Sequence, residues 1–408
     1  MSQVRYDVAV TGLGASTPLG GDLPSTWAGL LEGANGVGVL EQEWAAALPV
    51  RIAAQLAVEP TEQLSRVEAR RLDRCEQLAL VTAREAWADA GRPEVDPERL
   101  AVVIGTGTGG IRSILEQDDI LEASGARRVS PYVVPMMMPN GPAAWVSMEL
   151  GARGGARTPV SACTSSAEAI AMGLDLIRLG RADVVVVGGT EACVAPVPLA
   201  GFAQMTALST RNDEPALASR PFDTARDGFV LGEGAVVMVL ERADRAAARG
   251  ARVHGYVSGA GITSSAGHIT AADAEGQARA MRLALADAGV DALDVGLVHA
   301  HATSTPAGDV VEARAVADGV GLHPAVIATK SMTGHLLGGS GALGALAALL
   351  SLRDGVAPAI RNLENVDPEV KSDLVSGANR TGDWSHALAN STGFGGHNVA
   401  LVLSRHVS

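Results

Sequence analysis

The sequence predicts an α/β fold built from two similar halves, residues 1–250 and residues 251–408. Three observations support this: strands and helices alternate, some strands are apolar throughout, and one order of elements recurs. Asp183–Val187 is the clearest apolar strand, typical of a sheet that helices cover on both faces. The recurrence includes a repeated four-residue sequence, which is Ala88-Asp89-Ala90-Gly91 in the first half and Ala286-Asp287-Ala288-Gly289 in the second. We therefore expect a duplicated α/β unit with a covered sheet in each half.

Apolar and β-branched runs predict the strands of the first half, and helical apolar spacing that ends at a glycine predicts its helices. In chain order these elements are a strand at Val8–Leu13, a helix at Leu72–Ala90, a strand at Ala101–Gly105, a helix at Thr164–Leu179, and strands at Asp183–Val187 and Ala235–Leu240. The halves divide in the Arg- and Ala-rich helix Arg242–Gly250.

The second half repeats this order with fewer residues. It has a strand at Val253–Ala260, a helix at Ala274–Ala288, a strand at Gly296–Ala300 and a helix at Ala342–Leu352. The helices at 164–179 and 342–352 each follow a motif with a candidate catalytic residue. The order of elements agrees between the halves although the residues match only weakly.

Composition excludes several classes of protein. The 408 residues, 47% of them hydrophobic, suffice for one large domain or two fused halves. A net charge of -13 argues against a nucleic-acid partner, and no apolar run is long enough to span a membrane. Three cysteines, Cys75, Cys163 and Cys193, have no metal-binding spacing and suit a reducing compartment. We expect a cytoplasmic protein without a signal peptide, metal or other cofactor.

Cys163 is the candidate nucleophile. It stands in Thr158–Ser166, where we expect a strand to end and a helix to begin, so the positive end of the helix dipole would favour its thiolate. Small neighbours on both sides leave room for a bulky thioester. Cys75, inside a predicted helix, and Cys193, after a strand, are interpreted as structural.

Two histidines and a lysine lie in turns of the second half. His301 follows an apolar strand, where open α/β sheets place ligands, and His335 lies among glycines before a helix. Lys330, one of only two lysines, stands five residues before His335. The turn Gly393–Gly396 is either a plain hairpin or a means of aiming a backbone N–H at a substrate oxygen. A thiolate with two histidines indicates covalent acyl transfer.

Together these motifs strongly resemble the β-ketoacyl-acyl carrier protein synthase II family, and the likeness runs essentially end to end. The motifs that carry it are Ala162-Cys163-Thr164-Ser165, Ala300-His301-Ala302-Thr303-Ser304-Thr305-Pro306, Lys330-Ser331-Met332-Thr333-Gly334-His335 and Asn390-Ser391-Thr392-Gly393-Phe394-Gly395-Gly396-His397-Asn398. The resemblance implies a thiolase-like fold, a five-layered αβαβα sandwich, and a homodimer.

The resemblance also implies a ping-pong condensation. Cys163 would take an acyl chain from acyl carrier protein, and His301 and His335 would promote decarboxylation of malonyl carrier protein to an enolate that attacks the acyl group. The N–H groups of Cys163 and Phe394 would form the oxyanion hole, and Phe394 would gate the chain. The supporting residues implied are Lys330 paired with Glu312, then Asp309, Thr303 and Thr305, and the acyl pocket is implied at Thr108, Thr392, Phe202 and Val134–Asn140.

Two groups of arginines are expected to bind the acidic carrier protein, although the chain itself is acidic. The family docks its carrier at similar positions, and the alternative is that these are solvated helix faces. The residues are Arg66, Arg70, Arg71, Arg74, Arg127 and Arg128.

Three positions depart from the usual family pattern. His299 stands where Asn is common, Ala302 replaces a common Gly, and Thr392 replaces a frequent Phe. Because of Thr392, the preferred length of the acyl chain and the response to inhibitors stay open. The sequence offers no physical account of His299.

Several functions remain to be weighed. The first is elongation in fatty acid synthesis, and the second is a ketosynthase of a type II polyketide or other specialised pathway, including an inhibitor-resistant duplicate. A non-catalytic partner subunit is disfavoured because Cys163 is present. A degradative thiolase is disfavoured because no cysteine follows Cys193. An initiating synthase is disfavoured because the segment 330–335 fits the two-histidine class.

Overall fold

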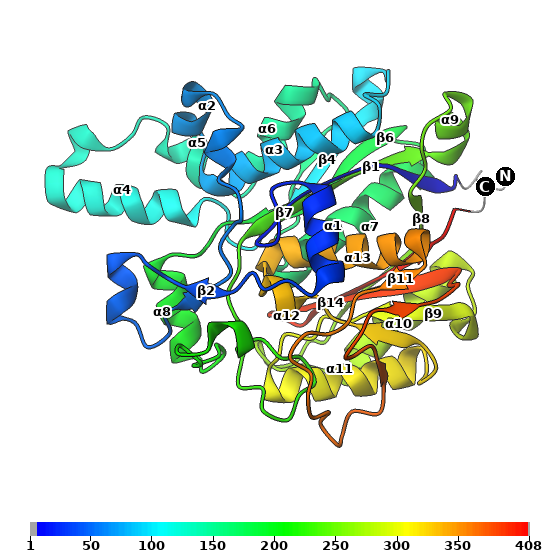
Figure 1. Cartoon of the computed structure of the whole chain (residues 1–408). Coiled ribbons are helices and arrows are strands. Elements are labelled where there is room, and N and C mark those ends of the chain that lie inside the picture. The colour runs from blue at the N-terminus through cyan, green and yellow to red at the C-terminus, as the bar shows by residue number, and fades with distance from the viewer. Residues whose placement is uncertain (1–5, 407–408) are drawn as a thin grey trace.

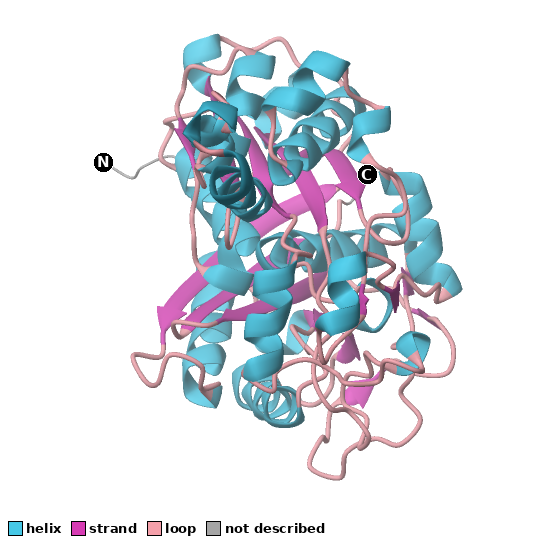
Figure 2. Ribbon diagram, turned by 90° about the vertical axis from the view of Figure 1, so that its left-hand side faces the viewer, coloured by secondary structure: helices cyan, strands magenta, loops and turns pink. Residues whose placement is uncertain are grey.

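Eleven strands form one mixed sheet in the computed structural model, which describes residues 6–406 (Figures 1 and 2). The strand order is β12-β10-β9-β14-β15-β8-β1-β7-β6-β4-β5. The strands are β1 (Val8–Ser16), β4 (Leu100–Gly105), β5 (Ala156–Arg157), β6 (Val184–Glu191), β7 (Gly234–Arg242), β8 (Gly255–Ser264), β9 (Val295–His299), β10 (Ala325–Ile327), β12 (Asp373–Leu374), β14 (His386–Gly393) and β15 (His397–Ser404). Two short ribbons pair β2 (Gly38–Val39) with β3 (Ile52–Ala53) and β11 (Val356–Ala357) with β13 (Arg380–Thr381).

The strand order repeats within the sheet. One part runs β5-β4-β6-β7-β1 and the other runs β10-β9-β14-β15-β8, with β12 added at the edge. Numbered along the chain, each part reads third, second, fourth, fifth, first. The predicted duplication of an α/β unit is therefore confirmed at the level of topology.

The two parts meet through β1 and β8. Their antiparallel ladder has only two pairs, Ala9 with Tyr256 and Val10 with Gly255. We expected a covered sheet in each half, and each half carries its own part of the sheet; this short ladder joins the two parts at their edges. The pairing gives both edge strands a partner, which an exposed edge would lack.

Helices fill the space between the two parts of the sheet and cover both outer faces (Figure 1). In the middle layer α7 packs on β4 and β6, and α13 packs on α7 and β14. On the outside, α3 covers β1 and β7, α10 covers β8 and β15, and α11 packs on α10. The five predicted layers are therefore present. The helices are α1 (Leu23–Glu32), α2 (Arg66–Arg71), α3 (Arg74–Asp89), α4 (Ile111–Ser124), α5 (Val133–Met137), α6 (Gly141–Leu150), α7 (Ser165–Arg178), α8 (Pro196–Gln204), α9 (Ala243–Ala248), α10 (Ala274–Ala288), α11 (Pro306–Gly319), α12 (Lys330–Thr333) and α13 (Ser340–Asp354).

The helix predicted over Leu72–Ala90 starts two residues later than expected. Leu72 is extended, and the Asp73 side chain accepts a hydrogen bond from the N–H of Cys75 at 2.8 Å. Glu76 completes a capping box by accepting from the N–H of Asp73 at 2.9 Å. This cap separates α3 from the short helix α2.

No helix within residues 6–406 is long and apolar enough to cross a membrane.

Candidate active site

Cys163 lies in a 3-10 turn, Ala162–Thr164, that leads directly into α7. The turn is held by hydroxyl groups, because Ser165 Oγ donates to the carbonyl of Ala162 at 2.7 Å and Thr164 Oγ1 donates to the carbonyl of Ser161 at 2.8 Å. Ala162 has a φ of 54°, a left-handed conformation that side chains rarely adopt. Such strain is typical of functional turns. The helix expected after Cys163 is present, but the strand expected before it ends earlier, at Arg157 of β5.

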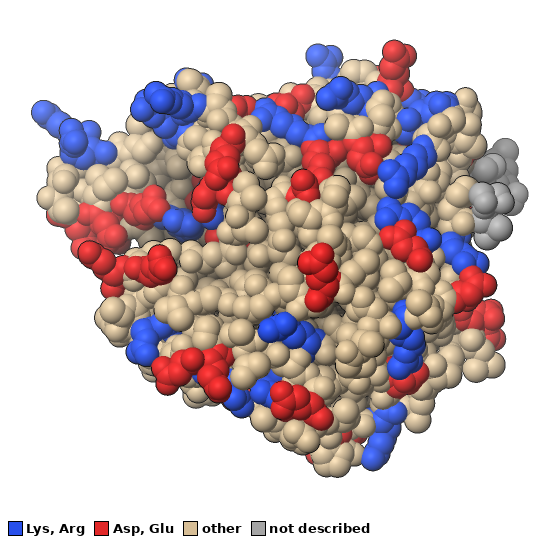
Figure 3. Space-filling view, viewed as in Figure 1, with Lys and Arg blue, Asp and Glu red and all other residues tan. Residues whose placement is uncertain are grey.

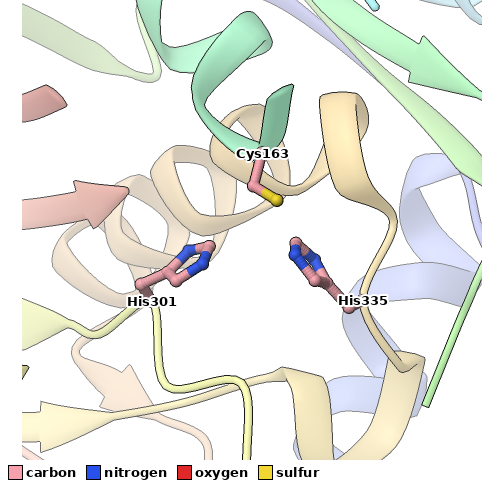
Figure 4. Close-up of side chains that lie close together, drawn as sticks. All are labelled: Cys163, His301 and His335. Atoms are coloured by element: carbon pink, nitrogen blue, oxygen red, sulfur yellow. The ribbon is translucent and has the colours of Figure 1, made fainter. Parts of the chain in front are cut away.

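His301 and His335 come from two other elements and point toward the Cys163 sulfur (Figure 4). His301 follows β9, and His335 lies between α12 and α13. The ligand atoms of the three side chains lie within 4.8 Å of one another. The two rings meet edge to face with centroids 5.3 Å apart. His335 Nδ1 is hydrogen-bonded to Ser340 Oγ at 2.8 Å, which orients the ring and leaves Nε2 for the cavity.

Glu312, on α11, holds the backbone of the His301 loop. Its two carboxylate oxygens accept from the N–H groups of His301 and Ala302, each at 2.6 Å. Asn390 Nδ2 donates to the same carboxylate at 2.6 Å. Ala302 has a φ of 32°, so this loop is held in a conformation that its sequence does not favour. Glu312 thus acts on His301 through the backbone.

Asp309 and two threonines complete this loop. Asp309 accepts from the N–H groups of Phe222 at 2.8 Å and Ser304 at 3.1 Å. The hydroxyl groups of Thr303 and Thr305 lie 3.1 Å apart. Both threonines face the cavity beside Cys163.

Lys330 does not form the direct pair with Glu312 that we expected. Its Nζ donates instead to the carbonyl oxygen of His301, and no ion pair joins it to Glu312 within the described residues. The Glu312 carboxylate instead accepts from the three N–H donors described above. Burial lowers the pKa of Lys330 to about 8, although Glu312 and Cys163 raise it.

The Cys163 thiol is less acidic than the sequence predicted. Burial raises its pKa to about 12, against the lowering effects of the Lys330 charge and of the N–H groups of Cys163 and Phe394. Desolvation therefore opposes the stabilisation of the thiolate by the helix dipole that the sequence predicts. Burial and the Lys330 charge also hold the pKa of His301 and of His335 well below the ordinary value, so both imidazoles are neutral at physiological pH.

The turn after β14 brings the backbone of Phe394 against the nucleophile. A side chain at Gly393 would place its Cβ 2.8 Å from the carbonyl oxygen of Ser161, so this close approach requires glycine. The backbone N–H groups of Cys163 and Phe394 both lower the pKa of the Cys163 thiol by hydrogen bonding to its sulfur, as two donors of an oxyanion hole would. Phe394 lines the cavity beside Cys163 and is 37% exposed.

A cavity of about 600 Å³ opens beside Cys163. Phe202 and Thr392, which the family resemblance assigns to the acyl pocket, line it. Thr108 does not, and neither does the segment 134–140 on and after α5, so these two predictions do not describe this cavity. Thr108 Oγ1 donates to Glu191 Oε1 at 2.6 Å instead.

Glu191 is a buried residue of the site that sequence reasoning assigned no role. It accepts from the N–H groups of Gly107 at 2.8 Å and Gly338 at 3.0 Å, and from Thr106 Oγ1 at 3.1 Å. It thereby ties the turn after β4 to the segment between His335 and α13. A carboxylate at the end of an otherwise apolar strand was the available signal.

His299 is also buried, at the end of β9. Its Nε2 is hydrogen-bonded to Thr329 Oγ1 at 3.0 Å, beside α12. Burial and the Lys330 charge lower its pKa to about 3, so it is a neutral structural partner of the Lys330 segment.

Cys163, His301 and His335 also form the one group within residues 6–406 whose donor atoms converge closely enough to hold a metal ion. The positive charge of Lys330 acts on all three side chains. This charge opposes a cation there.

The expected docking arginines divide into two sets. Those on α2 and in the turn after α4 are exposed, and they are Arg66, Arg70, Arg71, Arg127 and Arg128. Arg74 is not among them, because its side chain is 14% exposed and forms ion pairs with Glu59 and, at 2.8 Å, with Glu233. Arg74 is therefore a structural residue and its predicted docking role was wrong.

Comparison with known proteins agrees with this geometry. Residues 5–246 match the family described as Beta-ketoacyl synthase, N-terminal domain, and residues 254–364 match Beta-ketoacyl synthase, C-terminal domain. The chain is 44% identical over 405 residues to a 3-oxoacyl-[acyl-carrier-protein] synthase 2 of Mycobacterium bovis, covering 98% of this chain and 97% of the relative. It is 43% identical over 407 residues to the protein of that name from Synechocystis, covering 98% of each.

Solved structures show the same fold. A beta-ketoacyl synthase from Burkholderia phymatum superposes with a TM-score of 0.92 at 35% identity, covering 98% of this chain and 100% of that one. The ishigamide ketosynthase/chain length factor has a TM-score of 0.93 at 32% identity, covering 99% of this chain and 100% of that one. Sequence, fold and a Cys-His-His site at the cavity floor agree, and the chain belongs to the β-ketoacyl synthase family.

Proposed function

We propose that this enzyme condenses an acyl group held on Cys163 with malonyl-acyl carrier protein, and so lengthens fatty acyl chains by two carbons. The convergence of one thiol and two neutral imidazoles on a cavity beside an oxyanion hole carries the proposal. The full-length relatives of 43–44% identity favour fatty acid elongation. The likeness to the ishigamide ketosynthase supports a specialised pathway as the second candidate.

In the first half-reaction, Cys163 Sγ attacks the carbonyl carbon of the acyl thioester. Because the thiol is protonated at rest, its proton must leave as the bond forms, and His335 Nε2 is the nearby neutral base. The N–H groups of Cys163 and Phe394 hold the oxyanion. The bond between the acyl carbon and the carrier sulfur then breaks, and the carrier thiolate takes the proton from His335.

In the second half-reaction, the malonyl group loses CO₂ and its electron pair forms an enolate at the thioester oxygen. His301 and His335 donate N–H groups to that oxygen. The Ser340 hydroxyl can donate to or accept from His335 Nδ1, so Nε2 can act first as base and then as donor. The enolate carbon attacks the acyl carbon, the bond between that carbon and Cys163 Sγ breaks, and the released Cys163 thiolate takes one proton from solvent.

Acyl carrier protein is the proposed partner, bound by the exposed arginines on α2 and after α4. A homodimer is proposed because large apolar side chains stay exposed on α5 and the neighbouring helices, namely Val134, Met137, Ile114, Leu121 and Met148. The three free cysteines suit a reducing compartment, which supports the predicted cytoplasmic location.

The test first loads an acyl group onto the enzyme and then adds malonyl carrier protein to remove it. Wild type and Cys163→Ala are incubated with acyl carrier proteins from acetyl to palmitoyl, and intact mass is measured before and after malonyl carrier protein is added. We expect an adduct on wild type alone, which the malonyl carrier removes as a β-ketoacyl product two carbons longer. A wild-type protein that takes no acyl group would overturn the proposal. A preference for short or unusual chains would favour the specialised pathway.

A further inference from the structure

A buried carboxylate with five hydrogen-bond donors lies at the end of β6. It belongs to Glu191, which has no exposed surface. Its Oε2 accepts from the N–H groups of Gly107 at 2.8 Å and Gly338 at 3.0 Å. Its Oε1 accepts from Thr106 Oγ1 at 3.1 Å, from the N–H of Thr108 at 3.2 Å and from Thr108 Oγ1 at 2.6 Å. No ion pair to Glu191 occurs within the part of the chain that the structure describes.

These donors indicate that Glu191 is ionised. Three of the five are backbone N–H groups, which can only donate, so they suit an ionised carboxylate better than a carboxylic acid with a donor of its own. Burial raises the pKa of the carboxyl, and the hydrogen bonds from Thr108, Gly107 and Gly338 oppose that rise. The site therefore holds a buried negative charge in addition to the positive charge of Lys330.

The Glu191 carboxylate lies against both segments that carry reacting groups. A Cβ on Gly107 would lie 2.6 Å from its Oε2 and 3.7 Å from the carbonyl oxygen of Ala162, the residue before the nucleophile. A Cβ on Gly338, in the turn between His335 and α13, would lie 2.8 Å from the same Oε2. A side chain at either glycine would therefore displace the carboxylate.

Two buried charges act on the Cys163 sulfur in opposite directions. The Lys330 charge lowers the pKa of the thiol, and the Glu191 charge raises it. A third buried charged group, Glu312, acts on Lys330, whose pKa it raises. The other titratable side chains around the sulfur and the carboxylate are uncharged at neutral pH, namely His301, His335, Cys75 and Cys193. Glu191 is thus the negative charge that opposes a thiolate in the resting enzyme.

We propose that Glu191 is a positioning residue that fixes the segment after His335 and supplies the negative charge that keeps the Cys163 thiol protonated until an acyl thioester arrives. The inference rests on the proposed function, which supplies the thioester. The new bond between sulfur and the acyl carbon removes the negative charge from the sulfur, so Glu191 opposes the free thiolate and not the acylated enzyme. A residue with a structural role alone would slow acyl transfer when replaced, without making the thiol more acidic.

The experiment separates the charge of Glu191 from its hydrogen bonds. Glu191→Gln removes the charge and keeps the size, and Glu191→Asp keeps the charge and shortens the side chain. Thr108→Val is the matched control, because it removes one hydrogen bond to a carboxylate that stays charged. For each variant and wild type, mass spectrometry measures the rate of iodoacetamide modification of Cys163 as a function of pH. Acyl transfer is measured as kcat/KM with an acyl carrier protein, and thermal denaturation shows that each variant is folded.

We expect Glu191→Gln to speed alkylation at about pH 8 by at least about threefold, because loss of the opposing charge raises the thiolate fraction. The same variant should slow acyl transfer, because its amide NH₂ would face N–H groups that need an acceptor. Glu191→Asp and Thr108→Val should also slow acyl transfer, but both should leave alkylation within about twofold of wild type.

Unchanged or slower alkylation of folded Glu191→Gln would overturn the charge role. An equal rise in Thr108→Val would overturn it too, because a loosened turn would then account for the effect. If Glu191→Gln does not fold, Glu191→Asp decides: alkylation within about twofold of wild type, with slower acyl transfer, supports the proposal, and a larger rise rejects it. Wild-type enzyme that accepts no acyl group would overturn the proposed function instead, since alkylation needs no acyl donor.

Discussion

At the scale of single residues, the chemistry depends on a thiol that stays protonated until substrate arrives. Burial sets the pKa of Cys163 at about 12, and the Lys330 charge and two N–H groups act against it. The same groups that lower this pKa also stabilise the negative charge that develops during acyl transfer. A protonated resting thiol is protected from oxidation and from adventitious electrophiles, because the thiolate is the reactive form.

The pH dependence of alkylation tests this state. Only the thiolate reacts, so with a pKa of about 12 the rate of iodoacetamide modification should still climb at about pH 10, where an ordinary thiol with a pKa of about 8.5 has levelled off. Lys330→Met should slow the reaction at a fixed pH, because the lost charge lowers the thiolate fraction further. Mass spectrometry of Cys163→Ala gives the background from the two buried cysteines.

A plateau below about pH 8 would contradict the burial argument and restore the dipole-stabilised thiolate that the sequence suggested.

Sequence reasoning found the reacting residues but not their supports. Cys163, His301 and His335 lie in recognisable motifs, and the structure brings them together. The link from Thr108 to Glu191 joins residues 83 apart in the chain, and Lys330 binds a carbonyl 29 residues away. No local pattern shows which oxygen a buried lysine will reach, since that depends on how the loops fold around it.

At the scale of elements, the crossing of α7 and α13 positions the site. Cys163 precedes α7 and His335 precedes α13, so the contact between these helices sets the distance between nucleophile and imidazole. The contact is close, because a Cβ on Gly341 would lie 2.8 Å from both the Cβ and the backbone nitrogen of Ala167. Ser166 Oγ reinforces it by accepting from the N–H of Ala342 at 2.8 Å.

Gly341→Ala should therefore destabilise the protein and slow acyl transfer together. The added methyl group has no room without moving a backbone, and overpacking of this kind costs about 1–3 kcal/mol in free energy of unfolding. Denaturant unfolding and the rate of Cys163 loading measure the two effects.

Gly201→Ala on α8 is the matched control, because nothing lies within 4 Å of its Cβ position. Helix propensity predicts a gain of about 0.5–1 kcal/mol for this exposed change. An equal effect of the two substitutions would show that helix propensity, and not the α7–α13 contact, determines the outcome.

The ends of helices were predicted correctly where a capping residue was identified in the sequence, and incorrectly where a capping residue was missed. The helix Ala274–Ala288 was predicted with its observed bounds, with Gly289 in the left-handed conformation after it. The break at Leu72 had a sequence signal, Asp73 followed by Glu76, that a long apolar periodicity concealed. The β1–β8 pairing has two residue pairs and no signal of its own.

At the scale of the whole molecule, charge is unevenly placed. The net charge of -13 opposes an acidic partner, yet basic side chains lie over α2 and at the outer end of the α4 arm (Figure 3). Arg71 lies over the ring of Tyr132 at 5.2 Å, which joins α2 to the segment just before α5. A local basic surface of this kind attracts an acidic partner protein to one part of this chain, although the chain as a whole is also acidic.

Reversal of two of these charges tests the docking surface. Arg127→Glu/Arg128→Glu should raise the apparent KM for acyl carrier protein by at least about fivefold at low salt, with a smaller effect at high salt because the interaction is screened. Loading from an acyl-pantetheine, which lacks the carrier protein, should not change.

The control reverses Arg153 and Arg181, two exposed arginines near the N-terminal ends of the parallel strands β4 and β6. Both pairs change the net charge by the same amount. If the two double variants behave alike, the effect belongs to overall charge and the docking surface is rejected.

The burial of α13 has a consequence for how the molecule holds together. Every residue from Ser340 to Leu352 is buried, by α7 on one side and by strands of the second part of the sheet on the other. A fragment ending near residue 250 would expose the matching face of α7, and one beginning there would expose α13. Each fragment would lose the free energy that this burial contributes, so we expect the two units to be less stable apart than together. A protein with two topological units should therefore melt in a single cooperative transition, with one calorimetric peak and no half-folded intermediate.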